Sequence, residues 1–273
     1  MIATSTNPTR RKSKRPTPIV CQPLETRTLF LIGTDGLDPG MLDDLFPPSP
    51  GDIHVEGGVL QVIGNDYADT AIVNKSGSTV TVTFNDWEPQ TFDAATISRV
   101  HIAVGDGNDL VQVSGIIAHV EGGGGDDMLI GSELNDTITG GAGNDVITGN
   151  AGDDRLNGGG GRDKLRGLDG NDRLYGGDAN DQLEGGNGID RLYGDAGNDF
   201  ASGGGSNDRI YGGEGSDSLV GGKGADLLYG ENGDDVINAA DGTSDLVDGG
   251  NGSDKASKGP RDNDQVFNVE TYI

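Results

Sequence analysis

A nine-residue repeat dominates the second half of the chain. Thirteen units run without insertion from Gly122 to Asn238, and the unit at 140–148 reads Gly-Gly-Ala-Gly-Asn-Asp-Val-Ile-Thr. Position 6 is Asp in all thirteen units, and position 8 is aliphatic throughout, with Ala201 as its only small member. Such a tandem array predicts a solenoid in which each unit packs against its neighbours.

The repeat frame extends beyond these units on both sides. Asp109, in an isolated upstream unit, precedes Asp127 by two whole periods, so we expect coils from about residue 97. After Ala239 the register slips by one, and two looser units follow, centred on Asp245 and Asp254. Residues 258–273 leave the pattern and are predicted to cap the last coil.

Each unit is expected to contain a turn and a short strand. The first five positions are mostly Gly with polar fillers, and Gly readily adopts the positive φ angles that tight turns need. We therefore expect six turn residues followed by a three-residue strand, with position 8 pointing inward and positions 7 and 9 outward. Some units replace Gly at position 4 (Leu134, Ala179, Ser206) or at position 2 (Asn150, Leu168, Asp195, Glu231).

The first 121 residues differ from the array. In 51–121, Val80, Val82 and Phe84 alternate with Thr after a turn at 75–78, which predicts a hairpin in a small β region. Residues 1–50 are basic and then proline-rich, as in a disordered tail and linker. The basic run Arg10–Arg15 fits either an unusual export leader or a disordered basic tail. The single Cys21 excludes an intramolecular disulfide framework.

The charge of the array requires compensation. The chain has a formal net charge of −26, and residues 122–257 hold 27 acidic against nine basic residues. Such a surface repels phosphates, so nucleic-acid binding is not expected. Carboxylates one strand apart, about 4.8 Å, repel by roughly 3–4 kcal/mol per pair at an effective dielectric of about 20. Calcium accepts carboxylate and carbonyl oxygens, whereas zinc prefers Cys or His, which the array lacks.

The unit resembles the consensus G-G-x-G-x-D-x-U-x of the RTX, or haemolysin-type, calcium-binding repeats. The resemblance implies an all-β, right-handed parallel β-roll with two units per coil, in which Ca²⁺ lies between successive turns on one edge. Position-6 carboxylates and carbonyls of the glycine turns would supply the ligands. One edge would then hold Asp109, Asp127, Asp145, Asp163, Asp181, Asp199, Asp217 and Asp235. The opposite edge would hold Asp136, Asp154, Asp172, Asp190, Asp208 and Asp226. Neighbour pairing implies about twelve ions, with the site nearest Leu134 the weakest, and Asp245 and Asp254 are further candidates.

Folding is expected to accompany calcium binding, because one aliphatic side chain per unit does not offset the ordering of nine residues. We expect a secreted or cell-surface protein with a structural or adhesive role. The alternative is an accessory module that assists the export or folding of a separate toxin or hydrolase. No catalytic motif such as H-E-x-x-H or G-x-S-x-G occurs, and no enzymatic activity is expected. The sequence has no apolar run long enough for a membrane helix, so no transmembrane segment is expected.

Two ladders of side chains recur at the period of the coil. Tyr175, Tyr193, Tyr211 and Tyr229 occupy position 9 of every second unit, with Arg173, Arg191 and Arg209 at position 7. This ladder either docks a polysaccharide or protein or only stabilises the sheet. His101 and His119 are also two periods apart, but two His alone do not make a zinc site.

A short motif precedes the β region. Residues 24–29, Leu-Glu-Thr-Arg-Thr-Leu, resemble an L-E-x-R-x-L-type N-terminal motif of exported proteins from planctomycete-like bacteria. The resemblance is consistent with an exported protein.

Overall fold

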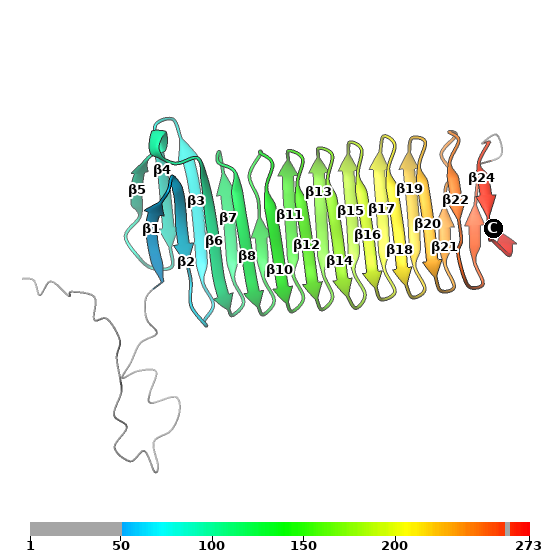
Figure 1. Ribbon diagram of the computed structural model, residues 1–273, viewed down its shortest axis with the longest axis horizontal. Helices are drawn as coiled ribbons and strands as arrows, with labels where there is room; N and C mark the ends of the chain where they lie inside the picture. The colour runs from blue at the N-terminus through cyan, green and yellow to red at the C-terminus, as the bar shows by residue number, and fades with distance from the viewer. Residues whose placement is uncertain (1–50, 260–262) are drawn as a thin grey trace, which may run out of the picture. The chain divides into compact units, whose positions relative to one another are not determined.

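The computed structural model describes residues 51–259 and 263–273. These residues form two long β-sheets, and the chain passes alternately from one sheet to the other as it winds (Figure 1). Apart from one 3₁₀ turn, Ala94–Thr96, every regular element that the described residues form is a strand. The expected parallel β-roll is confirmed. The predicted N-terminal tail, 1–50, with its basic run and L-E-x-R-x-L-type motif, lies outside the described residues.

The first sheet has twelve strands. In spatial order they are β1 (Asp52–Glu56), β2 (Val59–Ile63), β6 (Arg99–Asp106), β8 (Ala118–Gly124), β10 (Thr137–Ala142), β12 (Arg155–Gly160), β14 (Arg173–Asp178), β16 (Arg191–Ala196), β18 (Arg209–Glu214), β20 (Leu227–Asn232), β22 (Leu246–Asp248) and β24 (Gln265–Phe267).

The second sheet has thirteen strands. In spatial order they are β25 (Thr271–Tyr272), β23 (Lys255–Ser257), β21 (Val236–Asn238), β19 (Ser218–Lys223), β17 (Phe200–Gly205), β15 (Gln182–Asn187), β13 (Lys164–Asp169), β11 (Val146–Ala151), β9 (Met128–Ile130), β7 (Leu110–Ser114), β3 (Thr70–Ser76), β4 (Thr79–Phe84) and β5 (Gln90–Asp93).

The register between coils is two repeat units, as predicted. In the pair β14 and β16, for example, Tyr175 lies opposite Tyr193. The predicted slip after Ala239 is also present, because Leu227 pairs with Leu246, one residue beyond two periods. Upstream, β6 and β8 keep the frame, as expected for coils that begin near residue 97. The parallel pairing continues further, to β2 with β6 and to β3 with β7.

The strands are longer and the turns shorter than expected. A typical strand spans six residues, as in β14, and covers positions 7–9 of one unit and positions 1–3 of the next. Only positions 4–6 form the turn, so the expectation of six turn residues and a three-residue strand is wrong. The glycine-rich positions pair with the next coil despite their composition, as Gly177 does with Asp195. Tertiary pairing here overrides the low strand propensity of Gly.

The core is one continuous cluster of aliphatic side chains between the two sheets. Every position-8 side chain from Leu129 to Ile237 is fully buried, as predicted. The N-terminal end is closed by antiparallel strands instead of another coil: β1 pairs with β2, and β3, β4 and β5 form a meander. The predicted hairpin is confirmed, with Val80, Val82 and Phe84 buried. No helix in the described residues is long and apolar enough to span a membrane.

Candidate calcium columns at the edges of the solenoid

The regular spacing of the repeat places its Asp side chains in two columns, one at each edge where the chain passes between sheets. In each column the backbone N–H of one Asp donates to Oδ1 of the Asp in the next coil. The bond from Asp127 to Asp145 is 2.9 Å and the bond from Asp136 to Asp154 is 2.7 Å. All sixteen Asp residues predicted as ligands take part in this pattern, and all are buried. The two predicted edges are therefore real structural columns.

The second carboxylate oxygen, Oδ2, is the unusual feature of the columns. Among the described residues, fifteen Asp have a buried Oδ2 that accepts no hydrogen bond. They are Asp109, Asp127, Asp145, Asp154, Asp163, Asp172, Asp181, Asp190, Asp199, Asp208, Asp217, Asp226, Asp235, Asp254 and Asp264. Unpaired buried polar atoms are rare in proteins because their desolvation is not compensated. A periodic series of such oxygens is the arrangement that a bound cation would satisfy.

The surroundings of Oδ2 fit a calcium ion. At Gly140 a Cβ atom would collide with Oδ2 of Asp145 and would lie 2.7 Å from the carbonyl oxygen of Gly158 in the next coil. A carboxylate oxygen and a carbonyl oxygen thus face the same small space. Calcium binds such oxygens at about 2.3–2.6 Å. The same arrangement recurs at Gly185 with Asp190 and the Gly203 carbonyl, so the donor set fits the ion along the array.

Position 1 of the unit is Gly for a spatial reason. Gly140 and Gly185 are not in the left-handed region, so their backbone conformation is open to other residues. A Cβ atom at either position would instead collide with the carboxylate and the carbonyl. Position 1 is Gly in all thirteen units, a regularity for which the structure supplies the reason.

Positions 2 and 4 carry the positive φ angles of the repeat. Six of the eight residues that stand in place of Gly there keep a left-handed backbone, for example Leu168 (φ 82°) and Ala179 (φ 76°). These substitutions are strained for L-residues, yet their units retain the column geometry. The repeat therefore tolerates side chains at positions 2 and 4 but not at position 1.

The unit at 131–139 departs from the others. Neither Ser132 at position 2 nor Leu134 at position 4 has a positive φ. The Ser132 backbone N–H and hydroxyl both donate to Oδ2 of Asp136, at 2.5 and 2.9 Å. The oxygen that is unpaired elsewhere is thus already bonded, which supports the interpretation that the site nearest Leu134 is the weakest.

Burial and mutual repulsion shift the acidity of the columns. Burial, reinforced by neighbouring carboxylates, raises the pKa of Asp154 and Asp208 to about 8. The same causes raise the pKa of Asp109 and Asp181 to about 7. Carboxylates that are costly to ionise without a counter-charge are typical of functional sites that bind cations.

Three column members were missed by sequence reasoning. Asp69 donates its N–H to Asp109 and begins the first column, and Glu270 accepts from Asp254 and ends it. Asp264 accepts from Asp245 at the end of the second column. The spacing between Gly64 and Asp69 equals that between positions 1 and 6, which is the signal that could have found Asp69.

Comparison with known families agrees with this geometry. Residues 130–256 match the model of the RTX calcium-binding nonapeptide repeat in six overlapping segments. This part of the chain consists of RTX repeats. Its RTX array binds Ca²⁺ and folds as a β-roll, as repeats of this family do. A search of the curated proteins found no match. The coils around Asp109 and Asp127 lie outside the matched residues but continue the same columns.

Proposed function

We propose that this RTX protein is a secreted, calcium-dependent structural protein of the cell surface or matrix, which folds when it meets extracellular calcium. The observation that carries the proposal is the periodic series of buried, unpaired Oδ2 atoms. In a folded coil without cations, most of these oxygens face a carbonyl oxygen of a neighbouring coil, and both atoms carry partial or full negative charge. The ion-free coil is therefore expected to be unstable near neutral pH.

The proposed calcium ligands are the sixteen predicted Asp side chains together with position-1 carbonyls. Consecutive coils would share each ion, since the carboxylate and the carbonyl that face one space come from neighbouring coils, as Asp145 and Gly158 do. Two columns with one ion per interval of the regular array correspond to about twelve ions. Calcium there would supply positive charge that offsets the acidic excess of the array and links successive coils.

Export is proposed to precede folding. The array buries one aliphatic side chain per unit, which is little apolar area for the number of ordered residues. Extracellular calcium modules bind at about 10⁻⁴–10⁻³ M, far above the calcium levels inside cells. A chain that depends on such affinities stays unfolded during synthesis and folds after it leaves the cell.

The outer face of the first sheet is the proposed docking surface for a polysaccharide. Tyr175, Tyr193, Tyr211 and Tyr229 stack with ring centroids 4.9–5.0 Å apart and interplanar angles of 2–9°. The Arg155 guanidinium covers the ring of Tyr175 at 4.3 Å. Because the ring faces cover one another, the ladder offers its edges and hydroxyl groups outward. A shallow cleft beside it is lined by Tyr193, Tyr211 and Glu214. The ladder is therefore suited to hydrogen bonds between its regularly spaced hydroxyl groups and the repeating units of a polysaccharide. Its ring faces are covered and are not open to stacking on sugar rings.

Circular dichroism during a calcium titration tests the folding part of the proposal. The β signal should be small in excess chelator and should rise cooperatively with calcium. A complete β signal in chelator would overturn coupled folding.

Adhesion is tested separately, by sedimentation of the calcium-loaded protein with insoluble polysaccharide. Changing Tyr193 and Tyr211 to Phe keeps the stacked rings, removes two hydroxyls and should weaken binding. Co-purification of a hydrolase, with no polysaccharide binding, would favour an accessory role.

A further inference from the structure

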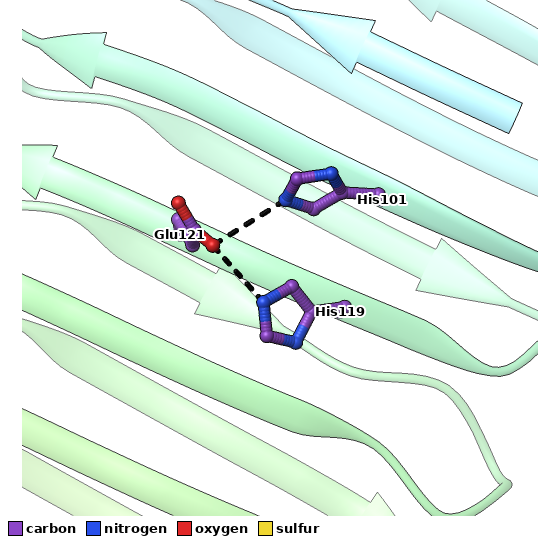
Figure 2. Close-up of side chains that lie close together, drawn as sticks. All are labelled: His101, His119 and Glu121. Carbon is purple, nitrogen blue, oxygen red and sulfur yellow. Dashed lines mark hydrogen bonds and ion pairs between the residues drawn. The ribbon is translucent and has the colours of Figure 1, made fainter. Parts of the chain in front are cut away.

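Two histidines and a glutamate meet on the outer face of the first sheet, away from the calcium columns. His101 in β6 and His119 in β8 are paired in register, with ring centroids 5.0 Å apart. Glu121 lies two residues after His119 on the same strand, so its side chain points to the same face. Figure 2 shows both imidazole rings directed toward the carboxylate.

Both imidazole rings approach the same carboxylate oxygen of Glu121. Nε2 of His119 lies 3.0 Å from Oε1 of Glu121, and Nε2 of His101 lies 3.4 Å from the same oxygen. The three candidate ligand atoms lie within 4.8 Å of one another. The two histidines are half-buried and line a cleft that opens to the surface, and Glu121 is exposed beside them.

Gln61 determines which nitrogen of His101 carries the proton. Nδ1 of His101 lies 2.9 Å from Oε1 of Gln61 in the neighbouring strand β2. An amide oxygen only accepts hydrogen bonds, so Nδ1 is the donor. In the neutral ring, Nε2 then has a free lone pair that faces a carboxylate oxygen. This nitrogen is buried and has no hydrogen-bond partner, so two electron-rich atoms face each other without a proton between them.

We propose that His101, His119 and Glu121 form a binding site for a first-row divalent transition-metal ion such as Zn²⁺. The ligands would be Nε2 of each histidine and the carboxylate of Glu121. Two imidazoles and one carboxylate suit zinc, nickel, copper or iron, whereas calcium and magnesium prefer oxygen ligands alone. The hydrogen bond from Nδ1 to Gln61 is the kind of outer contact that orients a metal-bound histidine. Three protein ligands beside a cleft leave a coordination position for water or for a group from a partner.

The site differs in place and in chemistry from the calcium columns. The columns lie at the turns and offer only oxygen atoms. The histidine site lies on strands β6 and β8, within the sheet whose outer face carries the tyrosine ladder further along. A protein loaded with calcium should therefore still bind one transition-metal ion. The competing explanation is an imidazolium–carboxylate cluster, in which a protonated His101 bonds Glu121 and no metal binds.

Titration of the untagged, full-length, calcium-loaded protein with Co²⁺ separates these explanations. In millimolar calcium, one equivalent of Co²⁺ per chain should bind and give visible d–d absorption, and Zn²⁺ should displace it. The His119→Asn and Glu121→Gln variants should lose this saturable binding while their calcium-dependent β signal stays intact. His54→Asn is the matched control, since half-buried His54 pairs with Asp52 on β1, and it should bind Co²⁺ as the parent does. Absence of stoichiometric binding, or binding that survives His119→Asn, would overturn the proposal.

Gln61 provides a second, independent test. Gln61→Leu keeps the size of the side chain but cannot accept from Nδ1, and it should weaken Co²⁺ binding by about 10–100-fold. Gln61→Glu retains an acceptor and adds a charge, so it should bind at least as tightly as the parent. Equal affinity in all three proteins would show that Gln61 does not position His101 for a metal.

Discussion

Asp127 donates its backbone N–H to Oδ1 of Asp145, 2.9 Å away, and Asp145 is the equivalent residue of the next coil. This bond uses Oδ1 of the carboxylate. The other oxygen, Oδ2, is buried near the Gly158 carbonyl oxygen. The backbone of each coil therefore holds the carboxylate of the next coil in place before any ion binds. Because the same bond recurs along both columns, the ligand arrangement is a property of the coil and not of individual sites.

Replacing one column carboxylate should remove calcium without breaking the coil. In Asp181→Asn, the remaining oxygen can still accept from the Asp163 N–H, which lies 2.7 Å away. The new amide group can donate to the Gly194 carbonyl, which faces Oδ2 in the parent. We expect at least one fewer bound calcium per chain, measured by equilibrium dialysis, while the β signal in saturating calcium stays equal to that of the parent. Asp178→Asn, at an exposed acid in the same unit, is the control and should leave the stoichiometry unchanged.

A methyl group at position 1 should destabilise the solenoid strongly. In Gly185→Ala, the new Cβ would collide with Oδ2 of Asp190 and would lie 2.7 Å from the Gly203 carbonyl oxygen. Overpacking of this kind costs roughly 1–3 kcal/mol, and it also narrows the space for calcium. Urea unfolding in saturating calcium should show the loss. Gly160→Ala is the control, since its Cβ would meet no atom closer than 4.0 Å and its φ is not positive. Equal stability of the two variants would contradict the proposed role of position 1.

The regular part of the structure could be predicted because the repeat period fixes it. A coil of two units places Asp109 and Asp127 on one edge and Leu174 over Leu192 in the core, and no long-range information is needed. The strand lengths could not be predicted this way. Glycine-rich positions 1–3 have low strand propensity, and only the neighbouring coil makes them pair.

The residues at the ends of the columns could not be predicted from the repeat, because the sequence spacing there differs from two units. Asp69 lies 40 residues before its partner Asp109, since strands β4 and β5 are inserted between their coils. Glu270 follows Asp254 by 16 residues and differs in residue type. The sequence analysis did not name Glu121, the third member of the histidine site, although the repeat pattern could have found it. Positions 7 and 9 of one strand share a face, so the position of His119 predicts that Glu121 lies beside it.

Protonation of the column carboxylates at low pH should stabilise the folded, calcium-free solenoid. In the folded, ion-free coil, burial and neighbouring carboxylates raise the pKa of Asp154 and Asp208 from 3.8 to about 8. The folded state then binds more protons than the unfolded state between about pH 4 and pH 8. Without calcium, the free energy of unfolding is thus highest below about pH 4 and falls as the pH rises through 8.

This pH dependence is measured by circular dichroism in excess chelator, where the β signal should increase from pH 8 to pH 4. In saturating calcium the trend should reverse, because protons then compete with the ion for the same oxygens. A β signal in chelator that decreases on acidification would contradict the raised pKa of the columns.

Restoring the repeat at its irregular unit should strengthen the weakest calcium site. In the parent, Ser132 donates two hydrogen bonds to Oδ2 of Asp136, and Leu134 does not adopt the positive φ found at position 4 elsewhere. The double variant Ser132→Gly, Leu134→Gly removes the hydroxyl and allows the left-handed turn at both positions. At calcium concentrations that leave the weak site of the parent empty, we expect one additional calcium per chain by equilibrium dialysis, together with a higher melting temperature. Ser132→Ala is the control, because it removes the hydroxyl but disfavours positive φ, and it should not gain the ion. If the double variant binds no more calcium than the parent, the backbone conformation at positions 2 and 4 does not control access of the ion to Asp136.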